Sequence, residues 1–133
     1  MNNLKVVEVV AAAIFSGCGK KILIAKRPDK AHQGGLWEFP GGKKEKGETA
    51  RQALHRELKE ELAISIKDSE SLIRLQHEYP DKRIELDVYK VMSFTGEPFG
   101  AEGQETQWIY LTDIKNYEFP AANQAIIDAL VVG

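Results

Sequence analysis

Residues 42–64 read GKKEKGETARQALHRELKEELAI, and this stretch decides the fold. Its second half predicts a helix that begins after Thr49 and ends at about Leu62. Thr49 can cap this helix, and Gln52, three residues on, can complete a capping box with it. The first half is polar and has a glycine near each end. The stretch therefore predicts a glycine-bracketed loop that leads directly into a capped helix.

The predicted helix carries a cluster of acidic residues. At about 100° per residue, Glu57, Glu60 and Glu61 fall within roughly 100° of arc on one helix face. Three carboxylates this close repel one another unless water or cations screen them. Alone, such a face is typical of solvated surface, balanced here by Arg56 and Lys59. The glycine-containing loop favours a second interpretation, because glycine lets backbone groups approach a ligand, and carboxylates are the hard ligands that Mg²⁺ and Mn²⁺ prefer.

Together, the loop and the helix resemble the signature of the Nudix hydrolases. That signature is glycine, five residues, glutamate, seven residues, Arg-Glu, an aliphatic residue, any residue, Glu-Glu, any residue, glycine and an aliphatic residue. Eight of its nine positions are met, by Gly42, Glu48, Arg56, Glu57, Leu58, Glu60, Glu61 and Ile64. The exception is Ala63, where the family has glycine. If this residue must be left-handed, alanine would cost about 1 kcal/mol there. Ala63 touches no carboxylate, so we expect it to affect stability more than catalysis.

The resemblance implies a fold, an activity and a cofactor. Residues 1–133 would form a single Nudix hydrolase domain of the α+β class, an α/β/α sandwich with a mixed β-sheet. The domain would cleave a diphosphate linkage with Mg²⁺, or with Mn²⁺ as the alternative ion. Triphosphates carry several negative charges, and the attack of water adds more, so divalent ions are needed to neutralise substrate and leaving group.

The resemblance also implies roles for individual residues. The implied metal ligands are the Gly41 carbonyl and the carboxylates of Glu57, Glu60, Glu61 and Glu102. Arg56 and Glu48 resemble the pair that holds the acidic residues in place. One carboxylate must take a proton from the attacking water, and the sequence leaves Glu57 and Glu102 open as that base. The implied catalytic set is therefore Glu48, Arg56, Glu57 and Glu102.

Outside this stretch, the hydrophobic pattern predicts further strands and a second helix. Val6–Phe15 and Ile22–Ala25 predict a buried hairpin around residues 17–19, and Trp37–Phe39 a short strand. Later strands are expected at Ser71–Glu78, Ile84–Phe94 and Gln107–Leu111, followed by a helix over Pro120–Val131. Strands and helices mixed in this order are typical of a sheet covered by helices.

Short segments along the chain narrow the resemblance to the MutT-like members of the family, which hydrolyse 8-oxo-dGTP to the monophosphate and pyrophosphate. These segments match in order and spacing, and they are Arg27, His32, Glu38–Gly42, Tyr79–Asp81, Gly96–Pro98, Glu102–Gln104 and Phe119–Asn123. They supply the candidate substrate-binding residues Arg27, His32, Glu38, Phe39, Tyr79, Asp81 and Asn123. Lys82 stands where the best-known pattern has arginine, and it cannot make the same planar fork of hydrogen bonds, so the base preference stays open.

Each candidate also has a plain structural interpretation. The Asn123 amide offers a donor and an acceptor to a guanine-type edge, but asparagine is equally typical of a helix start. Phe39, or Trp37, can stack on a base or belong to the core. Arg27 can contact phosphate or lie on the surface, and Asp81 can accept from a purine amine or form a turn.

Composition limits the remaining function classes. The 133 residues carry 18 Lys and Arg against 20 Asp and Glu, a net charge of −2, which disfavours a nucleic-acid polymer as partner. No apolar run approaches the roughly 20 residues of a membrane span, and the single Cys18 excludes an internal disulfide. We expect a cytoplasmic monomer without membrane contact that acts on a small nucleoside triphosphate.

Three hypotheses follow. The leading one is a metal-dependent hydrolase of oxidised purine nucleoside triphosphates that protects the nucleotide pool from mutagenic precursors. The second is a CTP-type pyrimidine triphosphate pyrophosphohydrolase, because Gly35–Phe39 also resembles that branch. The third is a non-catalytic Nudix module that binds a nucleotide, which the mutually repelling carboxylates disfavour.

Overall fold

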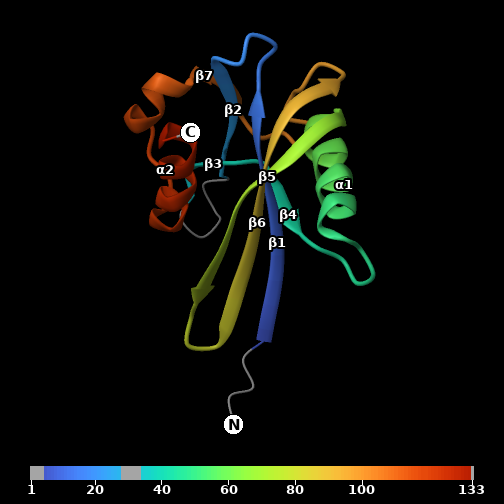
Figure 1. Ribbon diagram of the computed structural model, residues 1–133, viewed down its shortest axis with the longest axis vertical. Helices are drawn as coiled ribbons and strands as arrows, with labels where there is room; N and C mark the ends of the chain where they lie inside the picture. The colour runs from blue at the N-terminus through green and yellow to red at the C-terminus, as the bar shows by residue number, and fades with distance from the viewer. Residues whose placement is uncertain (1–4, 28–33, 133) are drawn as a thin grey trace.

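The computed structural model describes residues 5–27 and 34–132, and these residues form a mixed seven-stranded sheet with helices on both faces (Figure 1). The strands are β1 (Lys5–Phe15), β2 (Lys21–Lys26), β3 (Trp37–Glu38), β4 (Gly41–Lys43), β5 (Ser65–Glu78), β6 (Lys82–Thr95) and β7 (Thr106–Tyr110). The α-helices are α1 (Ala50–Leu62) and α2 (Gln124–Val132), and the 3-10 helices are η1 (Leu111–Asn116) and η2 (Ala121–Asn123).

Strand β1 is the centre of the sheet. The main strand order is β3-β2-β1-β6-β5, with β4 paired to β1 and β7 paired to β2. The pairing of β1 with β6 is parallel, whereas β1 pairs antiparallel with β2 and with β4. This combination makes the sheet mixed and confirms the α+β prediction. The predicted first hairpin is also confirmed, because Ile14 lies opposite Leu23.

The alternation of side chains along β1 divides the core into two layers. Val10, Ala12 and Ile14 pack toward the buried face of α1, whereas Ala11 and Ala13 pack with the residues of α2 on the other face. Successive side chains of a strand point to opposite faces, so a strand covered on both sides reads as a continuous apolar run. In Figure 1, α1 and α2 accordingly lie on opposite sides of the sheet.

The ends of α1 follow the predicted chemistry. The Thr49 hydroxyl accepts from the Gln52 N–H at 3.1 Å, and the Gln52 side chain accepts from the Thr49 N–H at 2.9 Å, which completes the capping box. Ala63 ends the helix in the left-handed conformation, with φ 60° and ψ 34°, and its N–H donates to the Lys59 carbonyl. Leu54, Leu58 and Leu62 are fully buried beneath the helix.

Several predicted boundaries are wrong. Strand β5 begins at Ser65 rather than at Ser71. The prediction missed its first residues because the pairing is irregular from Ile66 to Ser69, and the sequence there lacks the polar-apolar alternation of a regular strand. The start of the predicted glycine-bracketed loop belongs to strand β4, which spans Gly41–Lys43. Leu111, expected in a strand, begins η1. Helix α2 begins at Gln124, after the 3-10 turn η2. Among the described residues, no helix is long and apolar enough to cross a membrane.

Candidate active site

Two glycines of β4 bring its backbone against β1 and α1. A Cβ atom on Gly41 would overlap the Val10 carbonyl of β1, and one on Gly42 would lie 2.5 Å from the Glu57 carboxylate. The Gly41 N–H donates to the Glu61 carboxylate at 3.0 Å. The absence of side chains on Gly41 and Gly42 therefore lets two acidic residues of α1 lie directly beside this backbone.

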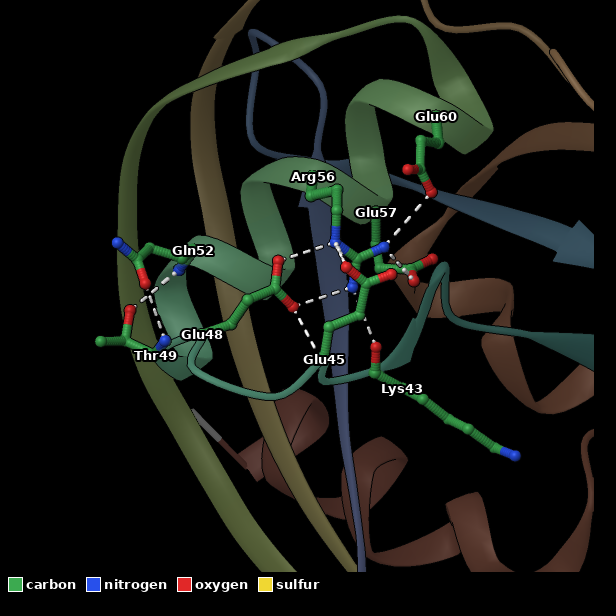
Figure 2. Close-up of polar contacts among 8 residues, drawn as sticks. All are labelled: Lys43, Glu45, Glu48, Thr49, Gln52, Arg56, Glu57 and Glu60. Carbon is green, nitrogen blue, oxygen red and sulfur yellow. Dashed lines mark hydrogen bonds and ion pairs between the residues drawn. The ribbon is translucent and has the colours of Figure 1, made fainter.

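Arg56 connects the acidic residues of α1 to the preceding loop (Figure 2). Its guanidinium forms two hydrogen bonds with the Glu48 carboxylate, from Nε at 2.7 Å and from Nη2 at 2.9 Å. Nη1 donates to Glu57 at 2.9 Å and to Glu60 at 3.3 Å, and Nη2 also donates to the Lys43 carbonyl. Such a two-pronged pair fixes geometry as well as charge. The sequence-based pairing of Arg56 with Glu48 thus appears in the structure as a direct contact.

This contact changes the ionisation of Glu48. The hydrogen bonds from Arg56, followed by one from the Glu45 N–H, lower the pKa of Glu48 to about 2. The same hydrogen bonds raise the pKa of Arg56 above its already high value. Both groups therefore keep their charges at any physiological pH, and the pair remains intact.

Glu61 shows the opposite behaviour. Burial, followed by the negative charges of Glu57, Glu102 and Glu38, raises the pKa of Glu61 to about 8. These acidic groups come from α1, from β3 and from the loop after β6, so the fold gathers negative charge around Glu61. A divalent cation held by carboxylate oxygens would relieve this repulsion, and the donor set is of the hard type that Mg²⁺ accepts.

The carboxylates are not yet arranged around a common point. Within residues 5–27 and 34–132, no three Asp, Glu, His or Cys side chains are grouped as a metal site. In Figure 2, Glu57 and Glu60 both turn toward the Arg56 guanidinium. Both carboxylates therefore form ion pairs with Arg56 in this structure.

Glu102 reaches this site on a loop that docks against the end of α1. The Phe99 N–H donates to the Leu62 carbonyl at 3.2 Å, and the Ala101 N–H to the Glu61 carbonyl at 2.9 Å. Helix ends leave carbonyl groups without intrahelical partners, and this loop supplies them. The loop therefore holds Glu102, predicted as a ligand or base, beside the acidic end of α1. Gln104, to which the sequence analysis gave no role, also contacts this end.

A cavity of about 260 Å³ opens beside the two glycines. It is lined by Val9, Val10, Ala11, Arg27, Glu38, Phe39, Gly41, Gly42, Leu86 and Asn123. Four predicted substrate-binding residues, Arg27, Glu38, Phe39 and Asn123, thus come together from distant parts of the chain. Arg27 forms an ion pair with Glu38 at 2.7 Å, which joins the cavity to the acidic cluster.

The aromatic and amide groups of this cavity are held from behind. Phe39 is only 5% exposed and stacks on Phe119, with ring centroids 5.2 Å apart, so it belongs to the core as well as to the cavity wall. The Asn123 amide donates to the Pro120 carbonyl at 3.2 Å. Trp37, the alternative to Phe39, packs edge-on against Tyr117 and is not among the cavity residues.

The other candidates lie elsewhere. Tyr79 follows β5 and lines a second, mostly apolar cavity of about 260 Å³ that shares Leu86 with the first. Asp81 is exposed in the turn between β5 and β6 and lines neither of these two cavities. His32 falls outside the described residues. The structure therefore brings Tyr79 next to the predicted site and leaves Asp81 apart from it.

Comparison with known proteins agrees with this geometry. The family model described as NUDIX domain matches residues 10–129. The chain is 39% identical over 121 residues to the 8-oxo-dGTP diphosphatase of Escherichia coli, covering 91% of this chain and 94% of that protein. It is 38% identical over 128 residues to the CTP pyrophosphohydrolase of the same organism, covering 96% and 93%.

A solved structure gives the same result. A chain from a structural study of MutT from Aliivibrio salmonicida and Vibrio cholerae superposes with a TM-score of 0.86 at 38% identity, covering 96% of this chain and 98% of that one. The loop, capped helix and acidic cluster described above are thus embedded in a fold shared over nearly the full length of such relatives. The chain belongs to the Nudix family.

Proposed function

We propose that this chain hydrolyses 8-oxo-dGTP, and other oxidised purine nucleoside triphosphates, to the monophosphate and pyrophosphate. Removing these nucleotides from the pool would prevent their incorporation into DNA. The observation that carries the proposal is the junction of two features, the acidic cluster around Glu61 and the cavity lined by Arg27, Glu38 and Asn123. Relatives named 8-oxo-dGTP diphosphatase at 39% and 40% identity support it.

The proposed reaction depends on a divalent metal, Mg²⁺ or Mn²⁺. Glu57, Glu60, Glu61 and Glu102, with the Gly41 carbonyl, would hold it. When bound, such ions neutralise the triphosphate and the leaving pyrophosphate. Arg56 would orient Glu57 and Glu60 through the contacts in Figure 2, and either Glu57 or Glu102 would accept a proton from the attacking water.

Asn123 is the proposed reader of the oxidised base. 8-Oxoguanine carries a hydrogen on N7, where guanine has a lone pair, so a selective site must present an acceptor toward N7. The contact with the Pro120 carbonyl uses one hydrogen of the Asn123 amide nitrogen, and the group retains a second hydrogen and an acceptor oxygen. Guanine would face that oxygen with a lone pair, at a cost of roughly 1–3 kcal/mol, or about tenfold to a hundredfold in affinity.

The deciding experiment compares the turnover of 8-oxo-dGTP, dGTP and CTP with Mg²⁺. We expect the highest kcat/KM for 8-oxo-dGTP. A preference for CTP would instead support the second candidate function, hydrolysis of pyrimidine triphosphates. The 38% identity to a CTP pyrophosphohydrolase favours this alternative. Turnover of none of the three nucleotides would contradict both.

Substitution of Asn123 tests the recognition itself. Asn123→Ala should reduce kcat/KM for 8-oxo-dGTP by about tenfold to a hundredfold while changing that for dGTP much less, because only the oxidised base loses a hydrogen bond. Asn116→Ala, at an exposed position in η1, is the matched control. Equal losses on both nucleotides would mean that Asn123 serves only the turn at Pro120.

We further propose that the chain works as a monomer on free nucleotides of the cytoplasm. Its net charge of −2 disfavours binding to a nucleic-acid polymer. Sedimentation at micromolar concentration tests the oligomeric state.

A further inference from the structure

We propose that Gln104 is a positioning residue, whose side-chain amide ties the backbone of Glu102 to the last turn of α1 and thereby fixes the Glu102 carboxylate beside Glu61. The inference rests on the proposed function, in which both carboxylates belong to the catalytic site. It adds a residue outside the helix and loop signature, one whose own side chain touches neither substrate nor metal.

Gln104 uses both ends of its amide. Its oxygen accepts from the Glu102 N–H at 3.0 Å, and its nitrogen donates to the Glu61 carbonyl at 3.1 Å. One planar group therefore connects the backbones of the two acidic residues, which are 41 positions apart in the sequence. Because the amide is rigid, displacement of either end would be transmitted to the other.

Glu61, one of the two residues that Gln104 connects, is anchored by two further hydrogen bonds. The Glu61 carbonyl also accepts from the Ala101 N–H at 2.9 Å, while the Glu61 carboxylate accepts from the Gly41 N–H at 3.0 Å. Glu61 is thus held between β4 and the loop that contains Glu102. Gln104 lies on the loop side of this arrangement and is not among the residues that line the cavity beside Gly41 and Gly42.

Two glycines let this loop pack closely on itself and on the end of α1. A Cβ atom on Gly100 would overlap the Gln104 carbonyl and lie 3.2 Å from the side-chain oxygen. Gly96 adopts φ +100°, and a Cβ atom there would lie 2.9 Å from the Ala63 carbonyl. Two glycines therefore permit the close packing that brings the amide within reach of the end of α1.

The proposed role predicts a specific kinetic signature. Gln104→Met keeps the length of the side chain and removes both hydrogen bonds. We expect kcat for 8-oxo-dGTP at saturating Mg²⁺ to fall about tenfold to a hundredfold with KM nearly unchanged, because a displaced catalytic group slows chemistry without weakening nucleotide binding. The control Gln107→Met, at an exposed position of β7, should keep the wild-type rate.

A double-mutant cycle separates positioning from general damage. If Gln104 acts through Glu102, then Gln104→Met should cause no further loss in the Glu102→Gln background, beyond about twofold. Independent losses that multiply, a wild-type kcat in Gln104→Met, or a wild-type kcat in Glu102→Gln would each overturn the proposal.

Amide hydrogen exchange of the Glu102 N–H provides a readout that needs no substrate. Exchange should accelerate in Gln104→Met and stay slow in Gln104→Glu, which retains an acceptor for this N–H. If the wild-type protein hydrolyses none of the nucleotides, the proposed function fails, but this measurement still tests the contact. Unchanged exchange in Gln104→Met would overturn the positioning role. If the methionine variant does not fold, Gln104→Glu still provides a test, because accelerated exchange in that variant would also overturn the role.

Discussion

Ala63 holds a backbone conformation that favours glycine, at the position where the family signature has glycine. Its φ of 60° and ψ of 34° are left-handed, which is the condition under which the sequence analysis expected a cost in stability. Ala63→Gly should therefore raise the free energy of unfolding by about 1 kcal/mol, measured by urea denaturation, and leave kcat nearly unchanged.

A second substitution at Ala63 should have the opposite effect on the free energy of unfolding. Ala63→Val should lower the free energy of unfolding, because a β-branched side chain tolerates the left-handed conformation less well. A large change in kcat with unchanged stability in Ala63→Gly would mean that this turn shapes the acidic site.

The raised pKa of Glu61 leads us to expect that, without metal, the stability of the protein falls as the pH rises. Its pKa of about 8 in the folded protein lies above the ordinary value of 4.5, so the folded state binds the proton more tightly than the unfolded chain does. The protonated Glu61 therefore contributes to the free energy of unfolding, and this contribution is complete below about pH 4.5. It is lost as the pH rises through about 8, and the free energy of unfolding falls by no more than about 1.4 kcal/mol per pH unit.

Urea denaturation in EDTA at several pH values across this window tests the effect. The free energy of unfolding should fall more steeply with pH in the wild type than in Glu61→Gln, and Mg²⁺ should reduce the difference. Identical slopes in the two proteins would show that Glu61 titrates normally.

At the scale of the element, α1 works as a carrier of charged groups in fixed positions. Arg56→Lys should reduce kcat by at least about tenfold, because lysine cannot form the two-pronged contact with Glu48 while also reaching Glu57 and Glu60. Arg51→Lys, on the same helix but directed to Ser69, is the matched control. Similar rates in both variants would remove Arg56 from the catalytic set.

The elements also show what a sequence can and cannot predict. Helix α1 was predictable because its caps and apolar spacing are local. Strand β4 was not, since Gly41 and Gly42 have little strand propensity and pair with β1 only through tertiary contact. The acidic residues of α1 lie in one contiguous stretch and could be predicted together. Glu102 and the cavity that joins Arg27 to Asn123 depend on residues far apart in the sequence, and only family resemblance connected them.

At the scale of the whole molecule, turnover should require a divalent cation. Excess EDTA should abolish hydrolysis of 8-oxo-dGTP, and Mg²⁺ should restore it, because divalent ions would neutralise the triphosphate and the leaving pyrophosphate during the reaction. Glu57→Gln should lower kcat by several orders of magnitude with an unchanged circular dichroism spectrum. Near-normal rates in excess chelator would rule out the proposed chemistry.

The parallel pairing of β1 with β6 has a consequence for how the chain reaches this structure. Lys5 pairs with Lys82 and Ile14 with Val91, so the central strand must wait for a partner synthesised much later. Folding is slowed because the entropy cost of closing so long a loop comes before the contacts that stabilise it. On the ribosome, β1 has no parallel neighbour until residues 82–95 have emerged. Both layers of the core depend on β1, so we expect the acidic cluster around Glu61 to assemble only after these residues have emerged.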